Sequence, residues 1–166
     1  MLIADCFERA IRIDEAAFGS DHPNVAIHVN NLGLVLQDIG DLAQARQCFE
    51  RAIRIDEAVF GPDHPTVARG VNNLGLVLRA LGDLAQARQC FERALRIGEA
   101  AFGTNHPQVA IYVNNLGLLL QDLGEFTQAR QCFERALKIF ERFLGEDHPK
   151  TVLARNNLAS LKRETD

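Results

Sequence analysis

The sequence lacks the features by which several large functional classes are usually identified. No apolar run approaches the roughly 18 residues that a membrane-spanning helix needs. The first ten residues, MLIADCFERA, carry neither the basic start nor the apolar stretch of a signal peptide. Lysine and arginine are not in excess, since the formal net charge is -4 with both signs interspersed, whereas a nucleic-acid-binding face is basic. We therefore expect a cytoplasmic protein with no nucleic-acid partner and no membrane partner.

Motifs of catalysis and of metal binding are missing as well. The sequence contains no glycine-rich phosphate loop, no HExxH and no GxSxG. Its four cysteines form no CxxC pair and instead recur at intervals of 42 residues, as Cys6, Cys48, Cys90 and Cys132. That spacing places them too far apart to share a metal ion, so we interpret each as a small apolar residue. The prediction is a protein that is not an enzyme and has no cofactor and no metal, in a reducing compartment.

What the sequence does contain is one segment repeated with a period of 42 residues. Complete copies cover residues 19–60, 61–102 and 103–144, and the first two agree at 32 of 42 positions. Residues 1–18 match the second half of a copy, and residues 145–166 match the first half. Self-similarity at such a period is typical of stacked repeat architectures. We therefore predict a single domain of stacked repeats over residues 1–166.

Each copy reads as two α-helices, which we name helix A and helix B. Helix A follows a His-Pro pair, because proline suits the first turn of a helix, and either Asp21 or His22 can cap it in the first copy. Gly40 ends helix A, as glycine does at a left-handed C-terminal position, and Asp41 begins helix B. The histidines of these pairs are expected to cap or pack. No segment alternates with period 2 as strands do, so we predict an all-α fold of eight helices in the order B, AB, AB, AB, A.

A helical wheel divides helix A into two faces. In the first copy the face expected to pack on helix B carries Val29, Leu32, Gly33 and Leu36, where Gly33 lets the two backbones approach closely. The apolar arc of helix B carries Leu42, Ala45, Phe49, Ala52 and Ile53. Its Glu-Arg runs are interpreted as a solvated face. Because one hairpin cannot bury its own apolar faces, neighbouring hairpins must stack.

The residues of these faces resemble a known repeat. The order Leu32-Gly33, Leu36, Ala45, Phe49, Ala52 is similar to the tetratricopeptide signature, with valine at the usual tryptophan position. The period of 42 and the text GPDHPxVA…NNLG resemble the kinesin-light-chain type of this repeat. The resemblance implies a right-handed α-solenoid of antiparallel helix hairpins, whose A helices line a concave groove that holds peptides. It also implies an adaptor-like role. Motor attachment is not implied, because the accompanying coiled coil is absent.

The face of helix A that points away from helix B is therefore the candidate binding surface. Asparagine pairs recur on it every 42 residues, and a primary amide can bond an extended peptide backbone without reading its sequence. We favour the first asparagine of each pair as facing the groove; the alternative is that one of each pair ties neighbouring helices together. The candidate peptide-binding residues are Ile27, Asn30, Asn31, Leu34, Gln37, Asp38, Arg69, Asn72, Asn73, Leu76, Arg79, Ile111, Asn114, Asn115, Leu118, Gln121, Asp122 and Asn156.

Differences between copies are concentrated on the same helix. Six of the ten differences between the first two copies fall between Asn24 and Ile39 or at the equivalent positions, while helix B is nearly invariant. Drift at exposed sites is an alternative, but the exposed positions of helix B did not drift. The pattern favours a recognition surface, and Arg69 and Arg79 at its centre suit an acidic segment or a C-terminal carboxylate.

The two ends of the chain differ. In the last helix A, Arg155 and Lys162 stand where earlier copies have the valine and leucine that pack on helix B, so we expect a capping helix that faces water. At the start, Ile3 and Phe7 belong to a helix B whose apolar arc is left uncovered. This predicts either a fragment of a larger adaptor or signalling protein, or a homo-oligomer formed through the N-terminal helix.

Overall fold

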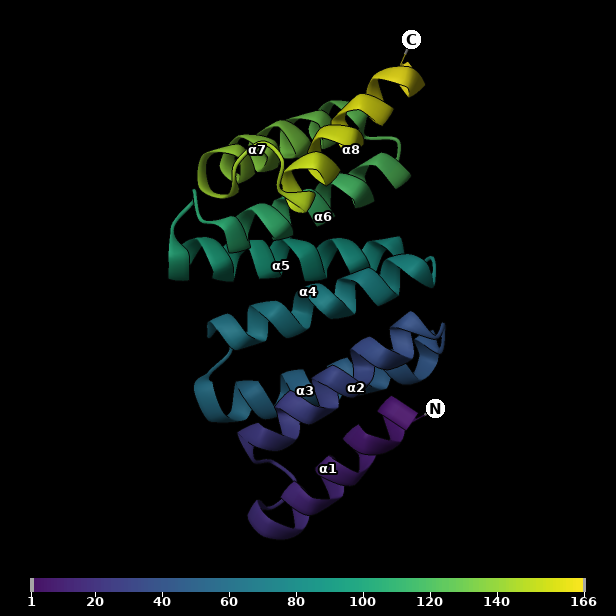
Figure 1. Cartoon of the computed structure of the whole chain (residues 1–166), viewed down its shortest axis with the longest axis vertical. Coiled ribbons are helices and arrows are strands. Elements are labelled where there is room, and N and C mark those ends of the chain that lie inside the picture. The colour runs from purple at the N-terminus through teal and green to yellow at the C-terminus, as the bar shows by residue number, and fades with distance from the viewer. Residues whose placement is uncertain (1, 166) are drawn as a thin grey trace. The chain divides into compact units, whose positions relative to one another are not determined.

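Every element of the chain is an α-helix in the computed structural model, which describes the backbone of residues 2–165 and the side chains of residues 3–161. The helices are α1 (Leu2–Phe18), α2 (Pro23–Asp38), α3 (Leu42–Phe60), α4 (Pro65–Ala80), α5 (Leu84–Phe102), α6 (Pro107–Asp122), α7 (Phe126–Leu144) and α8 (Pro149–Thr165). Odd-numbered helices are the predicted B helices and even-numbered helices are the predicted A helices (Figure 1). The all-α fold and the order of its helices are thus confirmed.

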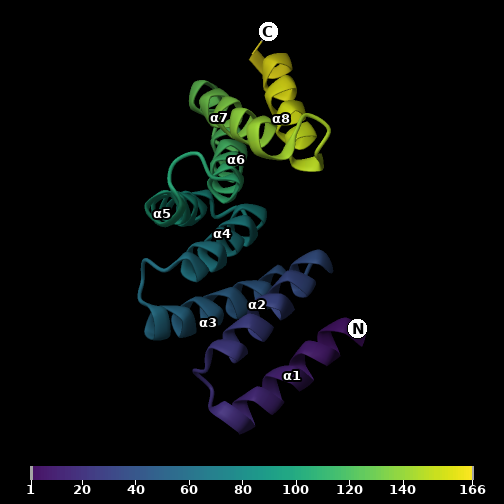
Figure 2. The same cartoon turned by 60° about the vertical axis from the view of Figure 1, so that its left-hand side comes forward.

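The chain divides into two compact units, Met1–Cys90 and Phe91–Asp166. In the first unit α2 and α3 form an antiparallel hairpin, with α1 packed on α2 and α4 packed on α3. In the second unit α6 and α7 form the corresponding hairpin, and α7 also packs against α8 (Figure 2). Each unit is therefore a small stack of hairpins, and the single domain expected over residues 1–166 stays a prediction.

A histidine caps the N-terminus of each helix A. His22 accepts a hydrogen bond at Nδ1 from the backbone N–H of Asn24, at 3.2 Å, so the histidine and not Asp21 caps the helix. The ring of Phe18, at the end of the preceding helix B, stacks on this imidazole with 4.7 Å between centroids. The same Nδ1 cap occurs at His64, His106 and His148. The capping role predicted for the histidines is confirmed.

Gly40 ends the first helix A in the way that its position predicts. Its φ of 86° is in the left-handed region that favours glycine. Its N–H donates to the Gln37 carbonyl, and the N–H of Asp41 donates to the Leu36 carbonyl at 2.8 Å, which together form a Schellman motif. The Asp41 carboxylate then accepts from the N–H of Gln44 and caps helix B.

Glycine and phenylalanine fit together inside each hairpin. A Cβ added at Gly33 would lie 2.8 Å from Cε1 of Phe49, and one added at Gly117 would lie 2.7 Å from Cε1 of Phe133. Both phenylalanines are fully buried. The sequence predicted a close approach of two backbones at Gly33; the group that lies beside this glycine is instead the Phe49 ring of helix B.

The arginine of the Glu-Arg run is not solvated as predicted. Arg51 is half-buried, and its Nη2 donates to Oε1 of Glu15 at 2.5 Å and to the carbonyl of Ser20 at 3.4 Å. In the second unit Arg135 makes the same contact with Glu99. The interpretation as a solvated face is therefore wrong for this position, because stacking brings the glutamate of the preceding helix B within reach.

Helix B and the following helix A meet through a pair of residues that differs at every contact. Nδ1 of His28 lies 3.0 Å from Oδ2 of Asp14. A Cβ added at Gly98 would lie 2.8 Å from Cε2 of Tyr112, so the tyrosine ring fills the glycine's space. At the last contact Phe140 and Ala154 belong to one buried cluster. The seam pairs are Asp14/His28, Gly98/Tyr112 and Phe140/Ala154. At the remaining contact the equivalent positions hold Asp56 and Gly70, and the space beside Gly70 is filled by Ile53.

The apolar arc of α1 is uncovered at Ile3, as predicted, but not at Phe7. Ile3 is 64% exposed and Ile13 is 57% exposed, whereas the equivalent Ala45 and Ile55 of α3 are 0% and 3% exposed. Phe7 packs against the core of the first unit. This part of the helix presents isoleucine to solvent where later B helices bury the same positions.

The outward-facing charge expected on α8 is seen at one of its two positions. Arg155 is exposed, and its Nη2 lies 3.1 Å from Oε1 of Glu141. The side chain of Lys162 lies outside the described residues. At the arginine position, α8 faces solvent as a capping helix does.

Candidate functional site

The candidate peptide-binding residues lie on the A helices, but the structure buries them to different degrees. Exposed residues are Ile27, Leu34, Asp38, Arg69, Asp122 and Asn156. Half-buried residues are Asn31, Gln37, Leu76, Arg79, Ile111, Asn115, Leu118 and Gln121. Buried residues are Asn30, Asn72, Asn73 and Asn114. In each unit the surface therefore consists of exposed side chains around buried amides.

The asparagines join successive A helices. Nδ2 of Asn73 on α4 donates to Oδ1 of Asn30 on α2 at 3.2 Å. Nδ2 of Asn157 on α8 donates to Oδ1 of Asn114 on α6 at 3.0 Å. The second asparagine of one helix A thus binds the first asparagine of the preceding helix A. These two bonds correspond to the alternative considered from the sequence, a tie between neighbouring helices.

We expect Asn73→Ala to lower the free energy of unfolding by about 1–2 kcal/mol, because it leaves the buried oxygen of Asn30 without its donor. Asn31 is the matched control: it occupies the equivalent position on α2, is half-buried, and makes no side-chain hydrogen bond among the described residues. Asn31→Ala should change stability by less than about 0.5 kcal/mol. Urea denaturation of both variants measures the difference, and equal losses would contradict the role assigned to Asn73.

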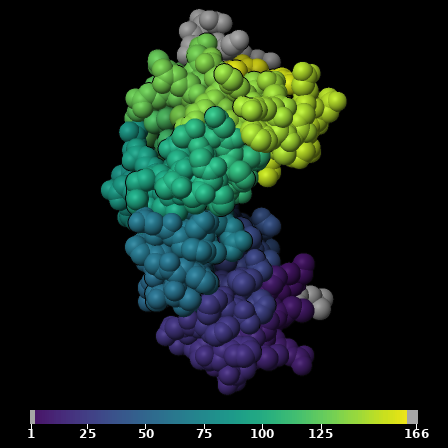
Figure 3. Space-filling model, turned by 90° about the vertical axis from the view of Figure 1, so that its left-hand side faces the viewer, coloured from purple at the N-terminus to yellow at the C-terminus, as the bar shows by residue number. Residues whose placement is uncertain are grey.

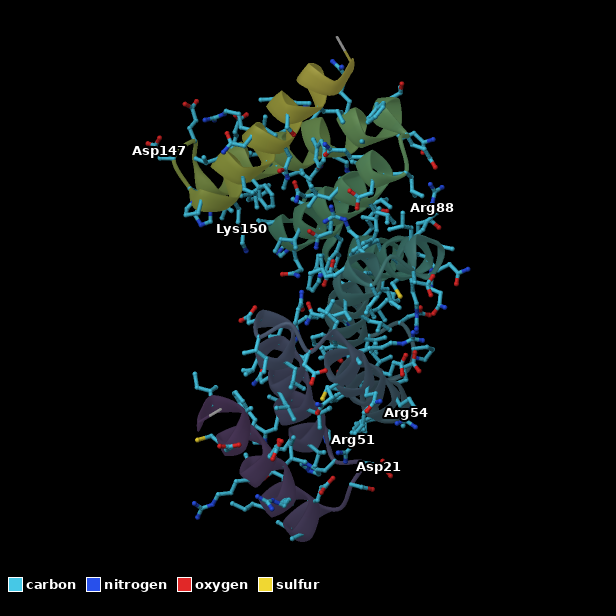
Figure 4. All side chains as sticks on the ribbon, turned by 90° about the vertical axis from the view of Figure 1, so that its right-hand side faces the viewer. Asp21, Arg51, Arg54, Arg88, Asp147 and Lys150 are labelled. Atoms are coloured by element: carbon cyan, nitrogen blue, oxygen red, sulfur yellow. The ribbon has the colours of Figure 1, made fainter. Side chains whose placement is uncertain are left out.

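A recess on the A-helix surface is enclosed by three helices of the second unit. Its volume is about 130 Å³, and its walls are almost entirely apolar. Lys150, labelled in Figure 4, stands in the first turn of α8 beside it. The lining residues are Ile111, Asn114, Asn115, Phe140, Lys150 and Leu153. Such a recess can hold one apolar side chain, with an ammonium group available to a neighbouring carboxylate or carbonyl.

Sequence reasoning found part of this recess. Ile111, Asn114 and Asn115 were predicted from the wheel, while Phe140 and Lys150 were not. Phe140 belongs to helix B, which was expected to form only the frame. A signal was present nevertheless, because the positions equivalent to Phe140 hold aspartate twice and glycine once.

In the first unit the electrostatics around Arg69 involve a carboxylate. Burial raises the pKa of Asp56, while the nearby Arg69 guanidinium and a hydrogen bond from Thr66 act to lower it. Arg69 is exposed, whereas Arg79 is half-buried and interacts within the protein. Oε1 of Gln37 is buried and has no hydrogen-bond partner among the described residues. An anionic ligand at Arg69 would have to compete with Asp56.

The cysteines lie apart from this surface. Cys48 and Cys132 are half-buried free thiols, and burial raises the pKa of both. Among residues 3–161 no group of three or more His, Cys, Asp or Glu side chains is placed to hold a metal ion. No helix in the described part of the chain has the length and apolar character required to cross a membrane.

The family model of the tetratricopeptide repeat matches residues 4–58, 25–100, 66–120 and 109–166. A solved structure of kinesin light chain TPR-like repeats from Podosopora anserina is 18% identical, with 98% of this chain and 76% of that chain covered and a TM-score of 0.80. BtubC (BKLC) from P. vanneervenii is 20% identical over 98% of this chain and 65% of that chain, with a TM-score of 0.81.

The N-terminal domain of stress-induced protein-1 from C. elegans is 21% identical over 84% of this chain and 96% of that domain, with a TM-score of 0.59. At these identities the likeness concerns the fold. No curated protein matches the sequence.

Proposed function

Because the chain belongs to the tetratricopeptide repeat family, whose members generally mediate protein–protein interactions, we propose that it is a non-catalytic module that binds a protein segment. The partner is a peptide or an extended segment of a protein, bound along the face of the A helices. We place the protein in a reducing compartment such as the cytoplasm, where its free thiols persist.

The recess beside Ile111 is the observation that carries this proposal. It is concave, apolar and bordered by amides, which suits one buried side chain of a bound peptide. Lys150 and the half-buried Asn115 at its edge can contact the peptide's polar groups. The buried asparagines then act beneath the ligand, since their hydrogen bonds hold α6 and α8 at the spacing that leaves the recess open.

Selection of phage-displayed random 12-residue peptides on the whole chain tests the proposal. Ile111→Asp should weaken the selected peptides at least about tenfold, because a carboxylate would enter an apolar recess. Ile13→Asp is the control, since it places the same charge at an exposed isoleucine of α1. Titration calorimetry measures the peptide affinities of both variants. An affinity that falls for the control and not for Ile111→Asp would contradict the A-helix site.

A second candidate function is self-association through α1, and the exposure of Ile3 and Ile13 favours it. Two copies that cover these isoleucines would remove apolar surface from water. Sedimentation velocity over a range of concentrations distinguishes the two functions. A monomer at every concentration supports the peptide-binding module alone, whereas a dimer lost on Ile3→Glu supports assembly.

A further inference from the structure

A second hollow surface lies on helix α7 and the connection between α5 and α6. A recess of about 520 Å³ is lined by Asn105, Gln131, Glu134, Arg135, Lys138, Ile139, Arg142 and Phe143. An adjoining recess of about 310 Å³ shares Asn105 and Phe143 and extends over Phe102, Gly103, Thr104 and His106. We name the two together the α7 recess. It shares no residue with the candidate A-helix surface. Figure 3 shows one face of the molecule in space-filling form, with the second unit in teal, green and yellow.

The three cations of the α7 recess differ in whether the protein itself supplies a carboxylate partner. Arg135 is fixed from inside, because its Nη2 donates to Glu99 and, at 2.8 Å, to the carbonyl of Thr104. Lys138 and Arg142 form no ion pair with any carboxylate of the described residues. The Arg142 guanidinium lies 5.4 Å from the centroid of the Phe143 ring. Two positive charges therefore remain available to a ligand.

The equivalent surface in the first unit shows that this charge is specific to the third copy. There the loop carries Asp21 where the α7 recess has Asn105, and α3 carries Ala58 where α7 has Arg142. Figure 4 labels Asp21, Arg51 and Arg54 in the first unit, where Arg51 donates to the carbonyl of Ser20, the residue before Asp21. The first unit thus sets two carboxylates against two cations, whereas the α7 recess sets one carboxylate against three cations. Both changes make the α7 recess more positively charged than the equivalent surface of the first unit.

Apolar surface accompanies these charges. Phe143 is 49% exposed, where the first copy has Val59, and Phe102 is 40% exposed while its ring stacks on His106 at 4.8 Å. Exposed aromatic rings beside unpaired cations favour a ligand that carries both negative charge and an apolar group. A ligand of charge alone would leave both rings uncovered.

We propose that the α7 recess binds an acidic segment of a partner protein. Carboxylates of that segment contact Lys138 and Arg142, and an apolar side chain of the same segment covers Phe143 and Phe102. Charge complementarity identifies the occupant. In the third copy Asn105 replaces the loop aspartate and Arg142 adds a cation, so the recess is positively charged and suits a negatively charged segment. The site is separate from the A-helix surface and does not depend on it.

Fluorescence anisotropy with a labelled Glu-Glu-Glu-Phe-Glu-Glu-Glu peptide tests the proposal on the whole chain. The double variant Lys138→Ala/Arg142→Ala should weaken binding about tenfold or more, since two charge-assisted contacts are lost. Arg12→Ala/Arg54→Ala is the matched control, because it removes two exposed cations from α1 and α3. Equal losses in the two double variants would overturn the proposal, and circular dichroism checks that both are folded. Ile111→Asp should leave this binding unchanged, which separates the result from that of the A-helix site.

A gain-of-function variant provides the converse test. Asp21→Asn/Ala58→Arg/Val59→Phe copies three residues of the α7 recess into the first unit and should raise the stoichiometry of peptide binding from one to two. An unchanged stoichiometry would contradict the assignment of these residues. A labelled thymidine oligonucleotide serves as the competitor: if it bound more tightly with the same dependence on Lys138 and Arg142, the protein partner would be wrong.

Discussion

Replacing Tyr112 with alanine should lower the free energy of unfolding by about 3–5 kcal/mol, the usual range for deleting a large buried ring. Tyr112 is 1% exposed, and its ring occupies the space left by Gly98 on the preceding helix. The alanine would leave a cavity that glycine cannot fill. Urea denaturation followed by circular dichroism measures the loss.

A compensating change distinguishes a specific pair from a merely sensitive core. Gly98→Phe alone should also destabilise, since a Cβ at this position already lies 2.8 Å from the Tyr112 ring. The double variant Gly98→Phe/Tyr112→Ala reproduces the Phe140/Ala154 seam pair of the next contact. It should recover more than half of the summed losses. A double variant as unstable as the sum would show that the two residues do not act as a pair.

Gly117→Val should lower the free energy of unfolding by about 3 kcal/mol, at the upper end of the usual cost of overpacking. A Cβ at this position lies 2.7 Å from Cε1 of Phe133 and 3.0 Å from Cβ of Cys132, so the added atoms meet a buried ring. For a domain of this size such a loss corresponds to a melting temperature lower by about 6–12 °C. Differential scanning calorimetry measures the shift.

The control for this substitution is present in the chain itself. Ala159 occupies the equivalent position on α8, where it is exposed. Ala159→Val should lower stability by less than about 1 kcal/mol, the difference in helix propensity. A similar loss at both positions would mean that the effect arises from helix propensity and not from packing on Phe133.

The features that the sequence predicted correctly depend on short segments. The Schellman motif at Gly40 and the cap at Asp41 involve residues within five positions of one another, so their signals are complete in any copy. The packed face of helix A follows from the helical period, which a wheel represents directly. Because the segment is repeated, each of these signals occurs in several copies, and together they were enough to predict the hairpin fold.

The features that were missed or left open depend on neighbouring hairpins. The bond from Asn73 to Asn30 spans 43 residues, and the pair from Arg51 to Glu15 spans 36. A wheel treats one helix at a time, so it places these side chains on an outer face and cannot show what the next helix brings to them. The recess beside Ile111 needs three helices, and Phe140 enters it from a helix that the wheel assigned to the frame.

The seam pairs also bear on how such a chain finds its native arrangement. Hairpins that are nearly identical can exchange partners during folding, which is a characteristic failure of repeat proteins. Here each seam has its own chemistry, from the Asp14 carboxylate and His28 imidazole to the Phe140 ring and Ala154 methyl. A hairpin docked in the wrong place would set ring against ring or leave a carboxylate facing apolar carbon. The seam pairs therefore specify which hairpins pack against each other. A chain with the same hairpins in a permuted order should misassemble although its composition is unchanged.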